Sequence, residues 1–326
     1  MKAGKLKESV LKRSILKQLH KRNDRVLVGP AVGVDYGAIN VADDEIMVVS
    51  TEPVTASATN QGRTAIYAAC NDVAASGAVP CGASVSLLLP TSLNEEELRD
   101  IIKDMEVACE ECHVDIIGGH TEVTRAVKAP LVTVTAIGTT PKDTLVHNKN
   151  LRPGMDIVVS KWVGLEGTAI LAKEHQESLR ERFPQPFIDK AKVFEQMMSI
   201  IPEAAVAVKS GVSAMHDVSE GGIFGALWEL AECADVGLEI DLKKIPIRQE
   251  TIEICEFFDL NPYKLISGGC LLMASTDGNE LVNNLEKVGI HATIIGKATD
   301  SNDRVLINED ERRFLETTQT DEIYRV

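Results

Sequence analysis

Four acidic residues stand where a ligand could approach the backbone closely. Asp35 lies in a loop flanked by glycines, and Glu52 follows an apolar strand. Asp72 lies in a helix of small residues, and Asp217 ends another predicted strand. Most surface acids are merely solvated, so only their positions make these four notable. Carboxylate oxygens are ligands of Mg²⁺, and Mg²⁺ in turn holds phosphate oxygens. The four acids are therefore candidate ligands of a metal-assisted phosphate site.

The common glycine-rich nucleotide motifs are absent. The chain contains neither GxxxxGK[ST] nor G-x-G-x-x-G. Any nucleotide must therefore be held in another way, and one physical route is Mg²⁺ bound by several carboxylates.

Alternating strands and helices must position these residues. In the first half we expect helices at 8–20 and 61–77, a helix opened by the Asn94/Glu97 capping box, and strands at 26–28, 46–49, 85–89, 114–117 and 131–137. Pro53 is expected to stop one strand, and Gly118-Gly119 to break another. In the second half we expect strands at 156–161, 213–217, 238–241, 270–275 and 292–296, and helices at 167–175, 187–200, 202–210, 222–235 and 249–257.

A change of composition at residues 148–154 predicts two domains, 1–150 and 151–326. The chain has 326 residues, a net charge of −15 and seven cysteines. The charge argues against nucleic-acid binding. An odd number of scattered cysteines indicates free thiols. The absence of a long apolar run or signal peptide predicts a cytoplasmic protein without a membrane span.

The first 25 residues are basic, with nine Lys/Arg against Glu8 and Asp24. One interpretation is a solvated helix face. The other is a mobile basic arm, including Lys5, that closes over an anionic ligand.

The motif series resembles, in order, the aminoimidazole ribonucleotide (AIR) synthase superfamily, which includes selenophosphate synthetase, thiamine-monophosphate kinase and the hydrogenase-maturation protein HypE. The similar segments are 4–6, 29–39, 51–55, 71–80, 118–123, 164–169, 217–222 and 267–269. Each alone is weak, but together they cover nearly the whole chain. The HypE-like members are the most similar.

The resemblance implies a mixed α+β fold with two domains. The N-terminal domains would pair into a dimeric β-barrel, and the C-terminal domain would be an α/β sandwich. It implies ATP and Mg²⁺ as cofactors. The implied metal ligands are Asp35, Glu52, Asp72 and Asp217; the implied nucleotide-binding residues are Asn71, Gly118, Gly119, Thr121, Gly221 and Gly222; and the implied catalytic residues are Lys5 and His120.

The implied reaction is phosphoryl transfer from ATP to an amide or carbonyl type of oxygen. The acceptor would be a small metabolite or a maturation substrate. The sequence departs from the family pattern at Val34, where an acid is common, and at Glu52, where the family has Asp. The chain also ends without the cysteine of HypE. An alternative is therefore a regulatory protein that binds ATP at a degenerate site without turnover.

Three sequence features that contain histidine or cysteine could be structural rather than functional. Cys109 to His113 fits C-x-x-C-H, but both cysteines fall on an apolar helix face, which favours core packing. His120 is as well explained by a structural role as by a functional one. His216, beside Asp217, is expected to pack in a strand.

Overall fold

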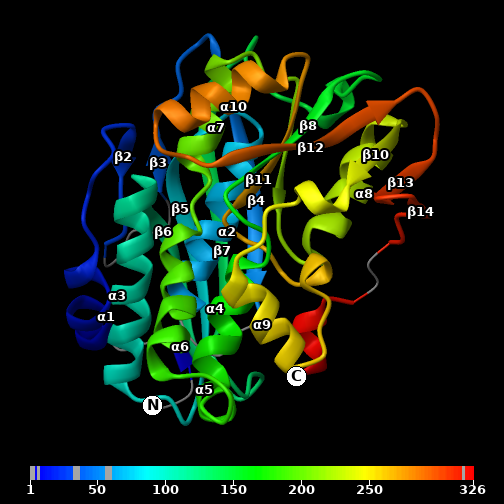
Figure 1. Cartoon of the computed structure of the whole chain (residues 1–326). Coiled ribbons are helices and arrows are strands. Elements are labelled where there is room, and N and C mark those ends of the chain that lie inside the picture. Colours follow the sequence, from blue (N-terminus) through cyan, green and yellow to red (C-terminus); the bar gives the residue numbers. More distant parts are fainter. Residues whose placement is uncertain (1–3, 6–7, 32–36, 56–60, 318–319) are drawn as a thin grey trace. The chain divides into compact units, whose positions relative to one another are not determined.

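A computed structural model describes residues 4–5, 8–31, 37–55, 61–317 and 320–326 (Figure 1). The chain forms two compact units. Unit 1 comprises Met1–Ala74 and Ala78–Asp143, and unit 2 comprises Ala75–Gly77 and Thr144–Val326.

Unit 1 is built on a five-stranded sheet with the order β1-β6-β5-β7-β4. The strands are β1 (Gly4–Lys5), β4 (Glu45–Val54), β5 (Val79–Pro90), β6 (Asp115–Thr124) and β7 (Leu131–Pro141). Strands β5 and β6 are parallel, and the other neighbours are antiparallel. A separate hairpin joins β2 (Val26–Val28) to β3 (Ala38–Ile39).

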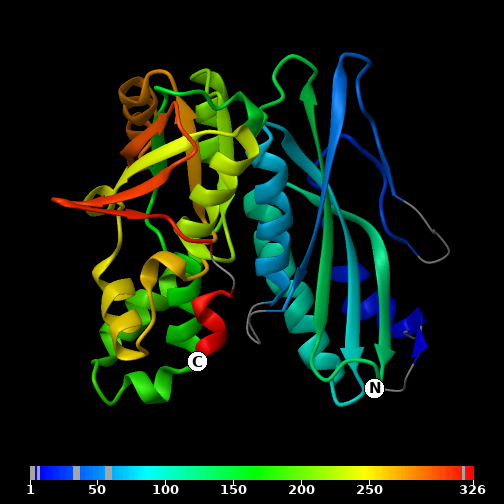
Figure 2. The same cartoon turned by 90° about the vertical axis from the view of Figure 1, so that its right-hand side faces the viewer.

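One face of this sheet is covered by α2 (Gln61–Ala75) and α3 (Glu95–Cys112), as Figure 2 shows. Strand β7 follows the period of two: Val132, Val134 and Ala136 are buried, and the residues between them are partly exposed. A Cβ at Gly138 would lie 2.4 Å from Cγ1 of Val73 on α2. The small residue lets the helix pack directly on the sheet.

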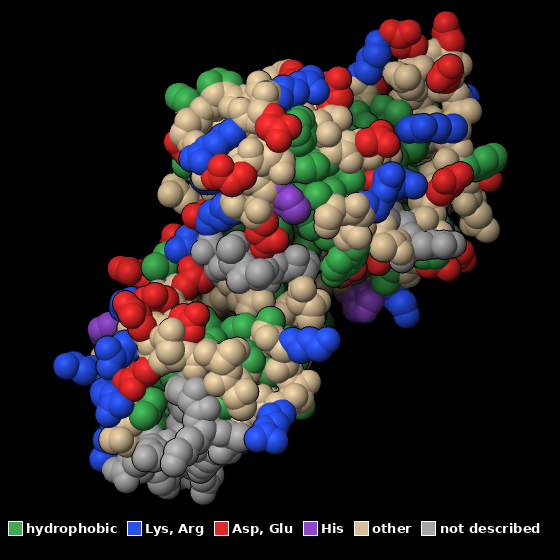
Figure 3. Space-filling view, turned by 90° about the horizontal axis from the view of Figure 1, so that it is seen from below, with side chains coloured by type: hydrophobic (Ala, Val, Ile, Leu, Met, Phe, Trp, Pro, Cys, Tyr) green, Lys and Arg blue, Asp and Glu red, His purple; other side chains and the backbone are tan. Residues whose placement is uncertain are grey.

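Ion pairs attach two arginines of the basic N-terminal segment to α3. Helix α1 (Glu8–Ser14) is followed by the 3₁₀ turn η1 (Leu16–Gln18). Arg13 pairs with Glu95 at 2.5 Å, and Arg22 pairs with Glu106 at 2.6 Å. Acidic and basic side chains also lie next to one another on the face drawn in Figure 3. This part of the segment is an ion-paired surface layer.

The predicted capping box is confirmed. The Asn94 side chain accepts the amides of Glu96 and Glu97, and the Glu97 carboxylate accepts the Asn94 amide.

Two expected breaks were wrong. Strand β4 continues through Pro53, because β4 is an edge strand and a missing N–H is tolerated there. Strand β6 continues through Gly118-Gly119, because a Cβ at Gly119 would lie 1.9 Å from the Val85 carbonyl oxygen and only glycine fits.

Unit 2 contains a seven-stranded sheet with the order β14-β13-β10-β12-β8-β11-β9. The strands are β8 (Asp156–Ser160), β9 (Ala214–Val218), β10 (Gly237–Asp241), β11 (Cys270–Ser275), β12 (Ala292–Thr299), β13 (Arg304–Asn308) and β14 (Glu311–Phe314). The helices are α4 (Leu165–Glu174), α5 (Gln176–Leu179), α6 (Gln185–Lys192), α7 (Ile201–Lys209), α8 (Gly222–Ala234), α9 (Gln249–Phe257) and α10 (Gly278–Lys287). Short 3₁₀ turns occur at η2 (Asn148–Asn150), η3 (Val193–Met197), η4 (Leu242–Lys244), η5 (Pro262–Lys264) and η6 (Glu322–Arg325).

The five strands expected in this half are confirmed as β8 to β12, which differ from the expected ranges by at most three residues. Helix α10 and the β13–β14 hairpin were not predicted. Helix α8 packs on the sheet through Ile223, Leu227 and Leu230, which belong to the main core cluster. In the part of the chain that the structure describes, no helix combines the length and apolarity that a membrane span requires.

Candidate functional site

A carboxylate pair joins β4 to α2 in unit 1. Glu52 projects from β4 on the helix-covered face and hydrogen-bonds with Asp72 of α2. Burial raises the pKa of Glu52 to about 7, and the charge of Asp72 and their mutual hydrogen bond act in the same direction. Two neighbouring carboxylates without a cation resist full ionisation.

Ser50 supports this pair from the same strand. Its hydroxyl donates to Asp72 Oδ2 at 2.5 Å. Residues 50 and 52 share one face of β4 because side chains alternate along a strand. The sequence prediction had not included Ser50, although its spacing from Glu52 could have revealed it.

The carboxylate pair suits Mg²⁺. This ion is usually held by one or two protein carboxylates together with phosphate oxygens and water. No group of three or more His, Cys, Asp or Glu side chains among the described residues is arranged to hold a metal ion. Asp35, the further predicted ligand in this unit, lies outside the described residues. The pair therefore fits a cation completed by ligand oxygens.

The other predicted residues of unit 1 lie elsewhere on the sheet or its helices. Asn71 is buried on α2 beside Asp72. Thr121 pairs with Leu87 on the helix-covered face, whereas His120 pairs with Ser86 on the open face. His120 Nε2 lies 3.2 Å from the Glu122 carboxylate.

Lys5 belongs to β1, where its backbone is in register with Glu122 of β6. Gly119 of β6 has no room for a side chain, whereas a Cβ at Gly118 would meet only the Gly37 nitrogen, at 3.8 Å. A Cβ at Gly37 would lie 2.6 Å from the Ile117 carbonyl oxygen, next to Gly118. The roles predicted for Lys5, Gly118, Gly119 and Thr121 stay predictions.

Three motifs of unit 2 converge on one loop, residues 265–269. The Ser267 hydroxyl accepts the Gly164 amide at 2.6 Å, and the Ser267 amide donates to the Ser219 carbonyl at 3.2 Å. The Gly268 amide donates to Glu166 Oε2 at 3.0 Å. The segments 164–169, 217–222 and 267–269, which are far apart in sequence, thus meet in what we call the loop junction.

Glu166 has an unusual environment in this junction. A Cβ at Gly268 would lie 2.3 Å from Glu166 Oε2, so the glycine makes room for the carboxylate. Burial raises the pKa of Glu166 to about 7, and the charges of Asp321, Asp217 and Glu220 add to this effect against the Gly268 hydrogen bond. Glu166 and Asp321 had not been predicted as site residues; Glu166 stood within a motif already singled out.

The amides of Gly221 and Gly222 both have acceptors in the structure. Gly221 donates to Asp321 Oδ2 at 2.6 Å, and Gly222 donates to the Ser219 carbonyl at 3.1 Å. Their predicted contact with phosphate stays a prediction. Asp217 is the penultimate residue of β9 in this unit, and its predicted ligation of the same cation as Asp72 also stays a prediction.

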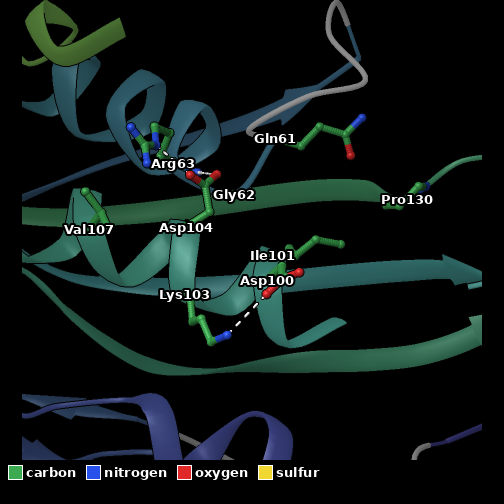
Figure 4. A pocket seen from close by; sticks show the side chains of 9 residues that line it. All are labelled: Gln61, Gly62, Arg63, Asp100, Ile101, Lys103, Asp104, Val107 and Pro130. Carbon is green, nitrogen blue, oxygen red and sulfur yellow. Dashed lines mark hydrogen bonds and ion pairs between the residues drawn. The ribbon is translucent and has the colours of Figure 1, made fainter. Parts of the chain in front are cut away.

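A cavity of about 390 Å³ lies at the opposite end of α2 from Asp72 (Figure 4). Arg63 points toward Asp104, with Nε 2.5 Å from its carboxylate, and Lys103 pairs with Asp100 at 3.2 Å. The charged side chains that line this cavity are therefore paired with one another. We assign it no role.

The cysteines pack as expected. Cys109 and Cys112 are buried on α3, and all seven cysteines are free thiols. His216 lies in β9, 2.9 Å from Glu229.

Family models match both halves of the chain. The model for the N-terminal domain of AIR synthase related protein matches residues 33–140, and the model for its C-terminal domain matches residues 152–308. A hydrogenase expression/formation protein of Methanocaldococcus jannaschii is 29% identical over 93% of this chain and 91% of its own. Carbamoyl dehydratase HypE of Rhizobium leguminosarum bv. viciae is 28% identical over 81% of this chain and 76% of its own.

The fold is shared with a solved structure. The crystal structure of the hydrogenase maturation protein HypE in complex with ATP superimposes with a TM-score of 0.79 at 19% identity, covering 98% of this chain and 97% of that chain.

Proposed function

This chain belongs to the AIR synthase related protein family, and we propose that it is a Mg²⁺-ATP-dependent phosphoryl-transfer enzyme. The observation that carries the proposal is the Glu52–Asp72 pair, held by Ser50 on a rigid strand and helix. Similar proteins of other organisms include carbamoyl dehydratase HypE, and a crystal structure of HypE contains ATP.

Asp72, Glu52 and Ser50 would have different roles in this reaction. Asp72 and Glu52 would hold Mg²⁺, and a bound Mg²⁺ would supply charge neutralisation at the phosphate oxygens. The Ser50 hydroxyl keeps the Asp72 carboxylate oriented through its hydrogen bond. Phosphoryl transfer depends more on such positioning than on covalent help from the protein.

We propose an amide or carbonyl type of oxygen as the acceptor, in hydrogenase maturation or on a small metabolite. This choice follows the names of the relatives, which include a hydrogenase expression/formation protein and a carbamoyl dehydratase. The alternative is a protein that binds ATP without turnover. The longer side chain of Glu52, at a position where the family has Asp, supports that alternative.

Isothermal titration calorimetry of ATP with Mg²⁺ tests the binding step. We expect Asp72→Asn and Asp217→Asn to weaken ATP binding at least tenfold. Asp100→Asn is the control, since this exposed residue of unit 1 pairs only with Lys103 in the described structure. Unchanged affinity in both site variants would exclude the proposed metal site.

Phosphate release distinguishes the enzyme from the regulatory protein. The protein is incubated with Mg²⁺-ATP and fractions of a metabolite extract. If one fraction stimulates phosphate release, and Asp72→Asn abolishes that release, the protein is an enzyme. If the protein binds ATP but no fraction stimulates phosphate release, the regulatory alternative is supported.

We also propose a homodimer that pairs through unit 1. Strand β4 is at the edge of the sheet, and Met47 and Val49 on its open face are 56% and 51% exposed. An edge strand with exposed apolar side chains is suited to pairing with a second copy.

A further inference from the structure

Three of the seven cysteines meet where α2 contacts α3 in unit 1. Cys70 lies on α2, and Cys109 and Cys112 lie on α3. None of the three residues is more than 3% exposed. The Cys70 and Cys112 thiols form a hydrogen bond with each other. Their sulfur atoms are therefore in contact between two different helices.

The packing of the two helices brings these thiols together independently of that bond. Figure 2 shows α2 and α3 side by side against the sheet of unit 1. Near the start of α2, a Cβ at Gly62 would lie 2.5 Å from the carbonyl oxygen of Ile101 on α3. Three residues before the α2 cysteine, the Tyr67 hydroxyl donates to the carboxylate of Glu111, the residue that precedes Cys112. The contact between the helices thus extends from the start of α2 to the two thiols.

Cys112 is the thiol that an oxidant should reach first. The hydrogen bond with Cys112 and burial raise the pKa of Cys70, and burial raises the pKa of Cys109. Because the thiolate is the reactive form, neither of these two is a ready nucleophile. Cys112 is the last residue of α3, and helix ends fray. A local opening of this last turn would expose Cys112 beside Cys70.

A bond between the two sulfur atoms would act on Asp72 through α2. Successive residues of a helix are about 100° apart, so the side chains of Cys70 and Asp72 point to nearly opposite sides of α2. Cys70 faces α3, whereas Asp72 is hydrogen-bonded to Ser50 and Glu52 of β4. A disulfide holds its sulfur atoms about 2.05 Å apart, closer than any non-bonded contact. Its formation therefore draws α2 toward α3 and Asp72 away from β4.

We propose that hydrogen peroxide converts Cys70 and Cys112 to a disulfide, and that this bond weakens Mg²⁺ binding by the Glu52–Asp72 pair. The position of the disulfide follows from the contact between the two thiols. Its effect rests on the proposed function, because that function assigns the carboxylate pair to Mg²⁺.

The oxidation takes place in two steps. The Cys112 thiolate attacks one oxygen of the peroxide, the O–O bond breaks, and the departing hydroxide takes up the proton that the thiol had released. The Cys70 sulfur then attacks the sulfur of the Cys112 sulfenic acid, and the S–O bond breaks. The oxygen leaves as water with the proton of the Cys70 thiol. The two thiols together lose two electrons, and the peroxide gains them as it becomes two molecules of water.

Peptide mass mapping after peroxide treatment tests the bond. Every protein in the experiment carries Cys233→Ser, because Cys233 is exposed and would be oxidised as well. We expect a single linked peptide pair that joins Cys70 to Cys112 and is absent from Cys70→Ser. Cys255→Ala is the matched control, since this buried thiol lies in unit 2 and its loss should leave the linkage unchanged. If the peroxide leaves Cys70 and Cys112 as free thiols, or joins Cys109 instead, the proposal is wrong.

Calorimetry of the reduced and the oxidised protein tests the effect on the cation site. We expect the disulfide to weaken Mg²⁺-ATP binding by roughly fivefold or more, the lower end of the usual coupling between two sites. Dithiothreitol should restore the affinity. Peroxide-treated Cys70→Ser should bind like the reduced protein, and Cys112→Ser serves the same purpose if Cys70→Ser does not fold. Equal affinities of the reduced and the oxidised protein, or an equal loss in Cys70→Ser, would overturn the proposed effect.

The disulfide and the proposed function fail separately. If the reduced protein binds Mg²⁺-ATP and Asp72→Asn does not, the proposed function stands, and a linked protein with unchanged affinity removes only the effect of the disulfide. If the reduced protein does not bind Mg²⁺-ATP, the proposed function and the effect on Mg²⁺ are both lost, while mass mapping still decides whether the disulfide forms.

Discussion

Glu52 and His120 lie on opposite faces of the five-stranded sheet of unit 1. Glu52 pairs with Val134, whereas His120 pairs with Ser86 and through it with Thr133. Val134 and Thr133 are successive residues of β7, so their side chains point to opposite faces. Strands β5 and β7 also separate the two, a span of about 14 Å at 4.8 Å per strand. His120 cannot contact the carboxylate pair within one copy of unit 1.

This geometry predicts different effects for the two positions. We expect His120→Gln to leave Mg²⁺-ATP affinity within about twofold of the wild type, because its side chain does not reach the carboxylate pair. Asp72→Asn should lose binding. Calorimetry of the two variants side by side checks this, and a loss as large in His120→Gln would mean that the histidine shares the cation site.

Proton release from Glu52 should accompany cation binding. With a pKa of about 7, Glu52 is mostly protonated at pH 6 and mostly ionised at pH 8, so Mg²⁺ must displace a proton at the lower pH. Affinity should therefore rise roughly tenfold from pH 6 to pH 8. Glu52→Gln removes this group and should flatten the increase, while the titration of ATP itself remains in both proteins. If the affinity of the wild type rises with pH no more steeply than that of Glu52→Gln, cation binding is not coupled to proton release from Glu52.

Glu166 should make folding less favourable as the pH rises. Its pKa is about 7 in the folded protein and about 4.5 when unfolded, so the folded state binds the proton more tightly. The resulting stability is fully present below pH 4.5 and is lost as the pH rises to 7.

Glu166→Gln retains an acceptor for the Gly268 amide but has no charge to lose. We expect the variant to gain roughly 1–3 kcal/mol in unfolding free energy, relative to the wild type, between pH 5 and pH 8. Urea unfolding at the two pH values measures the difference. A constant difference would show that Glu166 titrates normally.

A side chain at Gly268 should displace the carboxylate of Glu166. An added Cβ would lie 2.3 Å from Glu166 Oε2 and would push the carboxylate off the Gly268 amide. We expect Gly268→Ala to lower the unfolding free energy by about 1–3 kcal/mol, the usual range for overpacking. Gly29→Ala is the control, since no atom of the described residues lies within 4 Å of its added Cβ. If both variants lose the same unfolding free energy, the contact between the added Cβ and Glu166 does not explain the loss.

The strands and helices with clear periodicity could be predicted from the sequence. The strand at 156–161 and the capping box at Asn94 rest on local patterns, and the structure agrees with them. The errors at Pro53 and Gly118-Gly119 have a different cause. Whether a proline or glycine interrupts a strand depends on whether it lies at a sheet edge or against a neighbouring backbone, and single-sequence patterns do not contain that information.

The candidate site was predictable where one motif supplies a group and not where folding brings two segments together. Asp72 and Glu52 were singled out from local context, but the hydrogen bond between them depends on α2 packing against β4. Asp321 carries no local sign of function in the sequence. Its contact with Gly221 exists only because the segment 320–326 folds back on the start of α8.

The exposed edge of β4 gives a prediction about assembly. Val49 is 51% exposed on the open face, and a charge there would be buried without a partner if two sheets pair. We expect the wild type to have twice the chain mass by light scattering at micromolar concentration, and Val49→Lys to shift toward the single chain. Val288→Lys is the control, since Val288 is 58% exposed in unit 2. A wild type that scatters as one chain, or a Val49→Lys dimer as stable as the wild type, would place the interface elsewhere or remove it.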